Sequence, residues 1–163
     1  MDVAGAGDIL AAATPALVVM GLAFTPEVES RGSIPVGILA YGMSPVEAVT
    51  WTLIGNLAGI PVAWRLLPWS AGQLRRLGWL RRPLDWLLGH TRRRASRALA
   101  RGQEFGLLVF VGVPLPGTGA WAGVAVAHMF GMTWKRSVAP LVGGTVTAAV
   151  LVAILVEAGK LAL

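Results

Sequence analysis

The chain has no cysteine and few ionisable side chains, and these absences exclude several kinds of chemistry. Without cysteine it can form no disulfides, thiolate metal ligands or cysteine nucleophiles. The two histidines lie far apart, and no carboxylates are paired at metal-site spacing, which argues against a metalloprotease or phosphatase. The glycine-rich segments lack the lysine and the spacing of a phosphate-binding loop. We therefore expect a protein that is not an enzyme and has no cofactor or metal site.

Apolar residues dominate what remains. They make up 55% of the 163 residues, against 13% charged residues, and the mean hydropathy is +0.68. Four apolar runs span roughly residues 9–24, 34–67, 105–130 and 138–156. The last contains no charge, and at about 1.5 Å per residue a helix of that length covers roughly the 30 Å hydrocarbon core of a bilayer. The composition predicts an all-α integral membrane protein.

Positive charge is concentrated in one segment between the apolar runs. Ten of the fourteen Lys and Arg residues lie between Arg65 and Arg101, which indicates a cytoplasmic loop by the positive-inside rule rather than a nucleic-acid surface. Interleaved leucines and tryptophans predict an interfacial amphipathic segment that contacts anionic lipids, with a regulatory site as the alternative. We expect a single membrane domain in the inner (plasma) membrane, with repeats at 1–67 and 104–163 and a basic linker at 68–103.

The two apolar halves carry similar short motifs at corresponding positions. Gly42-Met43-Ser44 and Gly131-Met132-Thr133 each precede a long apolar run, and Gly55 and Gly144 each follow the leading glycine by thirteen residues. Upstream, residues 35–38 resemble residues 121–124. The first long run also opens with Ser44-Pro45-Val46-Glu47, the pattern of a capping box. These matches predict an internal repeat.

The apolar segment before each long helix is too short to cross the membrane twice. Residues 105–130 contain two prolines and two glycines near their middle, whereas each crossing needs about 20 residues. A re-entrant hairpin fits better, with its tip inside protein or facing a cavity. With the linker cytoplasmic, the two hairpins enter from opposite faces, as in inverted-repeat transporters. Whether residues 9–24 cross fully or form one hairpin arm stays open, and a chain this small is expected to form a homodimer.

Glu29 and Arg31 immediately precede the first hairpin break. A charge inside the bilayer costs about 2.5–3.5 kcal/mol on insertion scales, so each needs a partner or a purpose. Arg31 could receive an anionic headgroup or substrate, and Glu29 could take up and release a proton. Alternatively, the cluster caps a helix at the interface and snorkels to water.

The second break, at residues 114–121, carries no charge but offers unpaired backbone groups, the Thr118 hydroxyl and the Trp121 ring. Such a tip could bind an anion at the N-terminus of the following half-helix, or its small residues could serve close helix packing. Asn56 is expected to face protein and could simply tie helices together. The predicted substrate-binding residues are Glu29, Arg31, Ser33, Pro35, Asn56, Pro116, Gly117, Thr118, Gly119 and Trp121.

Residues 29–37, the Gly55-Asn56 pair and residues 110–121 together resemble the family of small multidrug export proteins, and the likeness extends over almost the whole chain. The acidic/Arg pair opposite a Pro-Gly hairpin is also distantly similar to the DedA and VTT-domain membrane proteins, which are associated with lipid scrambling and polyprenyl-phosphate translocation. This sequence departs from them by having Thr118 and Trp121 where their second motif carries an arginine.

These expectations favour a transporter that moves a small or amphiphilic solute by alternating access between opposed hairpins. Two alternatives stay open. The first is a lipid or polyprenyl-phosphate flippase, in which a headgroup crosses along the groove beside Arg31. The second is a scaffold or assembly protein that transports nothing, in which the basic linker recruits a partner.

Overall fold

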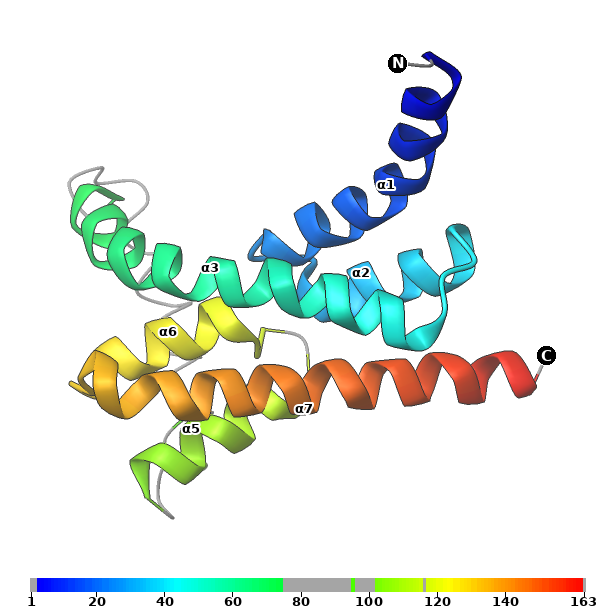
Figure 1. Ribbon diagram of the computed structural model, residues 1–163. Helices are drawn as coiled ribbons and strands as arrows, with labels where there is room; N and C mark the ends of the chain where they lie inside the picture. Colours follow the sequence, from blue (N-terminus) through cyan, green and yellow to red (C-terminus); the bar gives the residue numbers. More distant parts are fainter. Residues whose placement is uncertain (1–2, 75–94, 96–101, 116, 163) are drawn as a thin grey trace.

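The computed structural model describes residues 3–74, 95, 102–115 and 117–162, and every regular element in them is helical (Figure 1). The prediction of an all-α fold is confirmed for the described residues. The predicted linker falls mostly on residues 75–94 and 96–101, which lie outside the described part, as does Pro116. The helices are α1 (Val3–Phe24), α2 (Glu29–Pro35), the π-helix η1 (Val36–Ala40), α3 (Pro45–Leu74), α5 (Gln103–Gly112), α6 (Ala120–Met129) and α7 (Trp134–Leu161).

Helices α3 and α7 form the centre of the molecule. Within the described chain, two helical segments are long and apolar enough to cross a membrane, Pro45–Trp69 and Trp134–Leu161. The two helices are antiparallel, because the start of α3 lines a groove with the end of α7 and the reverse holds at the other end. Helix α3 continues to Leu74, beyond the repeat boundary expected at residue 67.

The start of α3 has the predicted capping box. The Ser44 N–H donates to Glu47 Oε2 at 3.0 Å, and the Glu47 N–H donates back to Ser44 Oγ at 3.3 Å. This exchange satisfies two backbone donors that a helix N-terminus leaves without partners. Thr133 occupies the equivalent position before α7 but makes no side-chain cap hydrogen bond.

The remaining helices pack onto this pair as two helical hairpins. Helices α5 and α6 have 10 residues each, about 15 Å of helix and so half of a hydrocarbon core. The end of α1 packs against α3, with the Phe24 carbonyl near Gly59, and α1 diverges from the other helices toward its N-terminus (Figure 1). At 22 residues, α1 is long for a hairpin arm, and α2 with η1 forms the returning arm.

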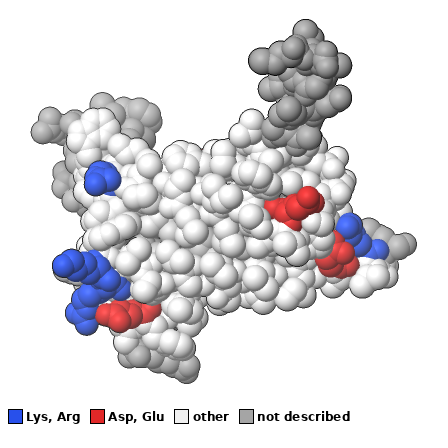
Figure 2. All heavy atoms as spheres, in the orientation of Figure 1, with Lys and Arg blue, Asp and Glu red and all other residues white. Residues whose placement is uncertain are grey.

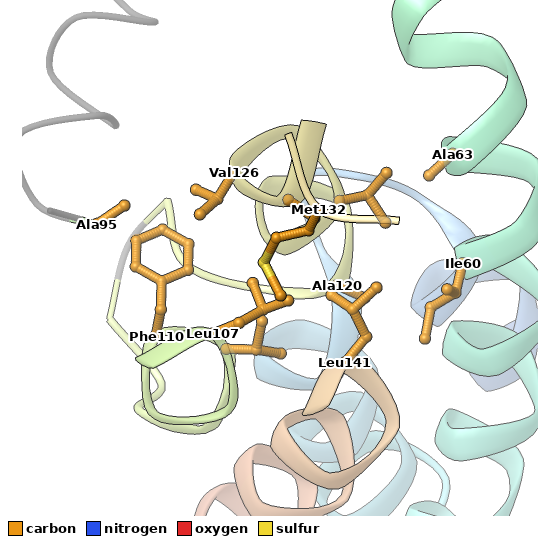
Figure 3. Close-up of a cluster of buried hydrophobic side chains, with 12 residues drawn as sticks. Ile60, Ala63, Ala95, Leu107, Phe110, Ala120, Val126, Met132 and Leu141 are labelled. Carbon is orange, nitrogen blue, oxygen red and sulfur yellow. The ribbon is translucent and has the colours of Figure 1, made fainter. Parts of the chain in front are cut away.

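Two buried clusters hold these hairpins in place. The larger one joins α5 and α6 to α3 and α7, and its side chains point toward one another from all four helices (Figure 3). Its labelled members are Ile60, Ala63, Ala95, Leu107, Phe110, Ala120, Val126, Met132 and Leu141. The smaller cluster joins α2 and η1 to both long helices through Ile34, Ile38, Ala48, Ala149, Val152 and Ala153.

The charged side chains visible in Figure 2 lie toward the two ends of the molecule, and the surface between them is uncharged on that face. Where α7 begins, Arg136 pairs with Glu104 at 3.0 Å, and where α7 ends, Lys160 pairs with Glu157 at 2.9 Å. Large apolar side chains are exposed between these ends; Leu155, for example, is 64% exposed. An apolar band bounded by charges is what a lipid bilayer stabilises.

Candidate functional site

The first residues of α2 and α6 meet in the interior of the molecule. The Glu29 side chain is only 5% exposed, and its carboxylate accepts the N–H of Trp121 at 3.1 Å and the N–H of Ala120. These donors belong to the first turn of α6, whose own N-cap, Gly119, has no side chain to bond them. Glu29 therefore caps α6 from the other half of the chain, with its charge at the positive end of the helix dipole.

Gly119 makes this close approach possible. A Cβ atom at position 119 would overlap the Glu29 carboxyl group, so no residue larger than glycine fits while the carboxylate stays in place. The Trp121 side chain makes a further contact between the halves of the chain. Its indole Nε1 donates to the Phe24 carbonyl at 3.1 Å and so joins the end of α1 to α6.

Arg31 binds the loop that leads into α6. Its guanidinium Nη2 donates to the Thr118 carbonyl and, at 2.9 Å, to the Thr118 hydroxyl oxygen. The same hydroxyl lies 2.7 Å from the Val113 carbonyl and 2.8 Å from the Leu115 carbonyl, so it accepts from Arg31 while donating within its own loop. Arg31 also lies close enough to Glu29 for the two charges to attract.

These groups surround a small cavity between the two hairpin tips. It encloses about 10 Å³, close to the lower limit for holding one water molecule. Asn56, which is 2% exposed, lines this cavity, and its Oδ1 has no hydrogen-bond partner among the described residues. Thr145 also lines the cavity and donates its hydroxyl hydrogen to the Leu141 carbonyl at 2.8 Å.

Most residues that the sequence singled out converge here. Glu29, Arg31, Asn56, Thr118 and Gly119 line the cavity, and Trp121 lies beside it. The alternative in which the charged cluster snorkels to water is wrong for Glu29, because that side chain is buried. At the N-terminus of α6, where the sequence analysis placed a possible anion site, the structure has the chain's own Glu29 carboxylate.

Three predicted residues lie outside the cavity lining. Ser33 is buried beneath Glu29, where it donates to the Glu29 carbonyl at 2.6 Å and lies 2.8 Å from the Thr52 hydroxyl. Pro35 ends α2, and Gly117 is exposed in the loop with a φ of 78°. The sequence analysis missed Ser30 and Thr145, although Thr145 follows Gly144 just as Asn56 follows Gly55.

Two grooves flank the long helices at opposite ends. One, of about 560 Å³, is lined mainly by apolar side chains from the start of α3 and the end of α7, including Val46, Val49 and Ile154. The other, of about 330 Å³, is lined by Pro61, Trp64, Arg65 and Trp134.

His128 packs beside the second groove. Its ring centroid lies 4.1 Å from that of Trp64, and its Nδ1 lies 2.9 Å from the Val124 carbonyl. The imidazole thus contributes to the packing of α6 against α3.

Comparison with known protein families identifies a family for this chain. Residues 29–151 match a family model described as "Putative small multi-drug export protein". The match begins at Glu29 and includes every described residue that lines the central cavity. Searches of the curated proteins and of the solved structures gave no match. Because the matched segment covers most of the chain, the protein belongs to this family of small multidrug export proteins and is a membrane protein.

Proposed function

We propose that the protein exports a small amphiphilic solute by alternating access between two inverted repeats, with α1, α2, η1 and α3 in the first and α5, α6 and α7 in the second. The first hairpin turns near the middle of α3, where Phe24 lies close to Gly59. The second turns near the middle of α7, where Gly112 lies close to Gly144. Each hairpin thus turns beside the middle of a long helix, and the two hairpins approach from opposite ends of the molecule. Both features support re-entrant hairpins.

Matching contacts in the two halves support the repeat. A Cβ at Gly55 would overlap the Met20 carbonyl of α1, and a Cβ at Gly144 would lie 2.8 Å from the Leu108 carbonyl of α5. Each long helix thus brings its glycine against the backbone of the hairpin that precedes it. The turns before α3 and α7 also share a positive-φ glycine, Gly42 at 64° and Gly131 at 67°.

The observation that carries the proposal is the contact between the hairpin tips. Glu29 and Arg31 of one hairpin bind backbone groups of the other, around Thr118 and Trp121. A solute passing between the tips must separate them and so must replace these hydrogen bonds. We infer that the described conformation is closed to both sides, and that the charged pair becomes available to the solute when the tips part.

The two grooves support an amphiphilic solute, and the positive charges at one end of the molecule support an orientation of the protein in the membrane. Their apolar and aromatic linings suit the apolar part of such a molecule. Arg65, Lys135 and Arg136 lie at the end of the molecule where α3 leads into the basic linker, so we assign that end to the cytoplasm of a multi-pass inner-membrane protein.

Efflux of a fluorescent amphiphilic dye from proteoliposomes tests this proposal. We expect Glu29→Gln and Arg31→Ala to lower the efflux rate about tenfold or more, because each removes a charge that the solute would bind when the tips part. Glu27→Gln, an exposed neighbour, and Arg136→Ala, a surface ion-pair partner, are the matched controls and should keep the wild-type rate. Wild-type efflux in both site variants would show that the pair is not the transport site.

The same apolar grooves favour a second candidate, a lipid or polyprenyl-phosphate flippase whose cargo keeps its tail in the bilayer. Liposomes that carry a fluorescent lipid separate the two functions. Lipid movement without dye efflux would replace the exporter with a flippase. If the purified protein moved neither molecule, the scaffold alternative would gain support.

A further inference from the structure

We propose that the groove of about 330 Å³ between the later part of α3 and the start of α7 binds a phospholipid with a negatively charged headgroup. Pro61, Trp64 and Arg65 contribute to its lining from α3, and Trp134 contributes from α7. Its volume falls within the range of about 300–1,000 Å³ that is typical of small-molecule sites. A lipid would occupy the groove whenever no solute does, so the inference does not depend on the exporter proposed above.

Arg65 gives this groove a positive charge that no acid neutralises. Its side chain is exposed and forms no ion pair with any residue that the structure describes, whereas Arg136 at the same end pairs with Glu104 at 3.0 Å. Figure 2 shows Lys and Arg side chains gathered at this end of the molecule. A guanidinium can bind a phosphate through two parallel hydrogen bonds, and basic pockets between membrane helices on the cytoplasmic side bind anionic headgroups.

The direction of the groove favours a lipid over a soluble anion. Pro61 lies one helical turn before Arg65 on α3, about 6 Å nearer the middle of the apolar band. The rings of Trp64 and Trp134 lie 5.2 Å apart in an edge-to-face arrangement, and indole rings favour the headgroup level of a bilayer. A phosphate held by Arg65 would therefore place its acyl chain against Pro61 and the two rings. A soluble anion would leave these apolar groups without a partner.

The groove at the other end of the long helices provides an internal comparison. None of the described residues that line it is basic or aromatic, and the charged residue in its lining is Glu157, which pairs with Lys160. Glu47, next to Val46 of that lining, is a second exposed acid at this end. A negatively charged headgroup is not favoured there. The chemistry that suits such a headgroup is thus confined to the groove beside Arg65.

The test is thermal unfolding of the purified, full-length protein in neutral-detergent micelles that contain a fixed total amount of phospholipid. Phosphatidylglycerol replaces phosphatidylcholine stepwise at constant ionic strength. Because a ligand that binds the folded state stabilises it, we expect a saturable rise in the unfolding midpoint that phosphatidylcholine alone does not produce. The half-saturating fraction of phosphatidylglycerol then measures the affinity of the site.

Two arginine variants that remove the same charge from the same end make the test specific. Arg65→Gln should raise the half-saturating fraction about tenfold or more, because it removes charge-assisted hydrogen bonds to the headgroup. Arg136→Gln is the control and should cause a smaller shift, because Arg136 does not line the groove and pairs with Glu104. A second pair tests the aromatic lining. Trp134→Leu should weaken the response to phosphatidylglycerol, whereas Trp69→Leu, an exposed residue outside the lining, should not.

Equal shifts in the two arginine variants would overturn the site, because they would mean that the positive end of the molecule attracts headgroups as a whole. Neither variant changes the basic linker, so any lipid that the linker attracts contributes equally to both. An unchanged response in Trp134→Leu would place the headgroup outside the groove and would overturn the site as well. A midpoint that does not depend on phosphatidylglycerol, in a protein that exports dye, would reject the lipid site and leave the exporter in place.

Discussion

Glu29 combines two costly features at one residue. Its φ of 44° is in the left-handed region, which non-glycine residues rarely adopt, and its carboxylate is buried. Strained backbone of this kind persists where surrounding interactions hold it, and it is concentrated at functional sites. The N–H groups of Ala120 and Trp121 supply those interactions. The strain and the burial thus both depend on contact with the second hairpin.

We predict that Gly119→Ala separates Glu29 from the N-terminus of α6. The new Cβ cannot coexist with the carboxyl group in its present position, and overpacking of this kind costs about 1–3 kcal/mol. The variant should unfold at a lower temperature in detergent and export dye more slowly. Gly21→Ala is the control, since nothing lies within 4 Å of its added Cβ and alanine favours the helix. Equal unfolding midpoints for the two variants would contradict the close contact at Gly119.

At this scale the sequence singled out five of the residues that line the cavity but did not predict how they interact. Glu29 and Arg31 stood out because charges are rare in apolar segments, and Gly119 stood out because glycines cluster where backbones approach closely. Nothing in the sequence indicated that the carboxylate binds the N-terminus of α6. That contact joins groups about ninety residues apart, so it depends on the tertiary arrangement of the hairpins.

At the scale of helices, packing between each hairpin and its long helix depends on single glycines. At Gly144 an added Cβ would lie 2.7 Å from Val111 Cβ and 2.8 Å from the Leu108 carbonyl, neither of which moves easily. At the adjacent Gly143 the tightest contact is 3.3 Å, to the flexible end of the Leu108 side chain. Neighbouring positions on one helix therefore tolerate very different side chains.

We predict that Gly144→Ala weakens the packing of α5 on α7 and lowers the unfolding midpoint, at a cost of about 1–3 kcal/mol. Gly143→Ala should be neutral or stabilising, because alanine exceeds glycine in helix propensity by up to about 1 kcal/mol. Thermal unfolding of both variants in the same detergent checks the contrast. A midpoint for Gly144→Ala at or above that of Gly143→Ala would mean that α5 does not approach α7 this closely.

The sequence located the long helices well but underestimated their lengths. Helix α3 includes Pro61, as expected, but it also continues through Pro68 to Leu74, where proline's usual effect on helices favours an end. Within the proposed repeat, the turns favour a different register from the sequence match of residues 35–38 to 121–124. In the turns, Met43 N–H bonds the Gly37 carbonyl and Met132 N–H bonds the Ala127 carbonyl, so Gly37 corresponds to Ala127. The π-helix η1 accommodates one extra residue, which an ungapped sequence comparison cannot detect.

At the scale of the whole molecule, the two long helices place equivalent residues at opposite ends. Val46 near the start of α3 is 76% exposed, and Lys135 near the start of α7 is also exposed. Because α3 and α7 are antiparallel, these two positions lie at opposite ends of the apolar band. Their placement across a bilayer decides whether the repeats are inverted, which neither hydropathy nor packing can establish alone.

Single-cysteine labelling in sealed vesicles tests whether the repeats are inverted. Because the chain has no native cysteine, only the introduced residue can be labelled. We predict that Val46→Cys reacts with a membrane-impermeant maleimide from the outside, whereas Lys135→Cys reacts only after the cytoplasmic face is opened, because positive charge is retained there. Both positions are near helix starts and exposed, so their intrinsic reactivity should be similar. Labelling of both from one side would contradict inverted repeats, because two antiparallel helices that span the bilayer must begin on different faces. It would also remove the opposed entry paths on which alternating access between the hairpin tips depends.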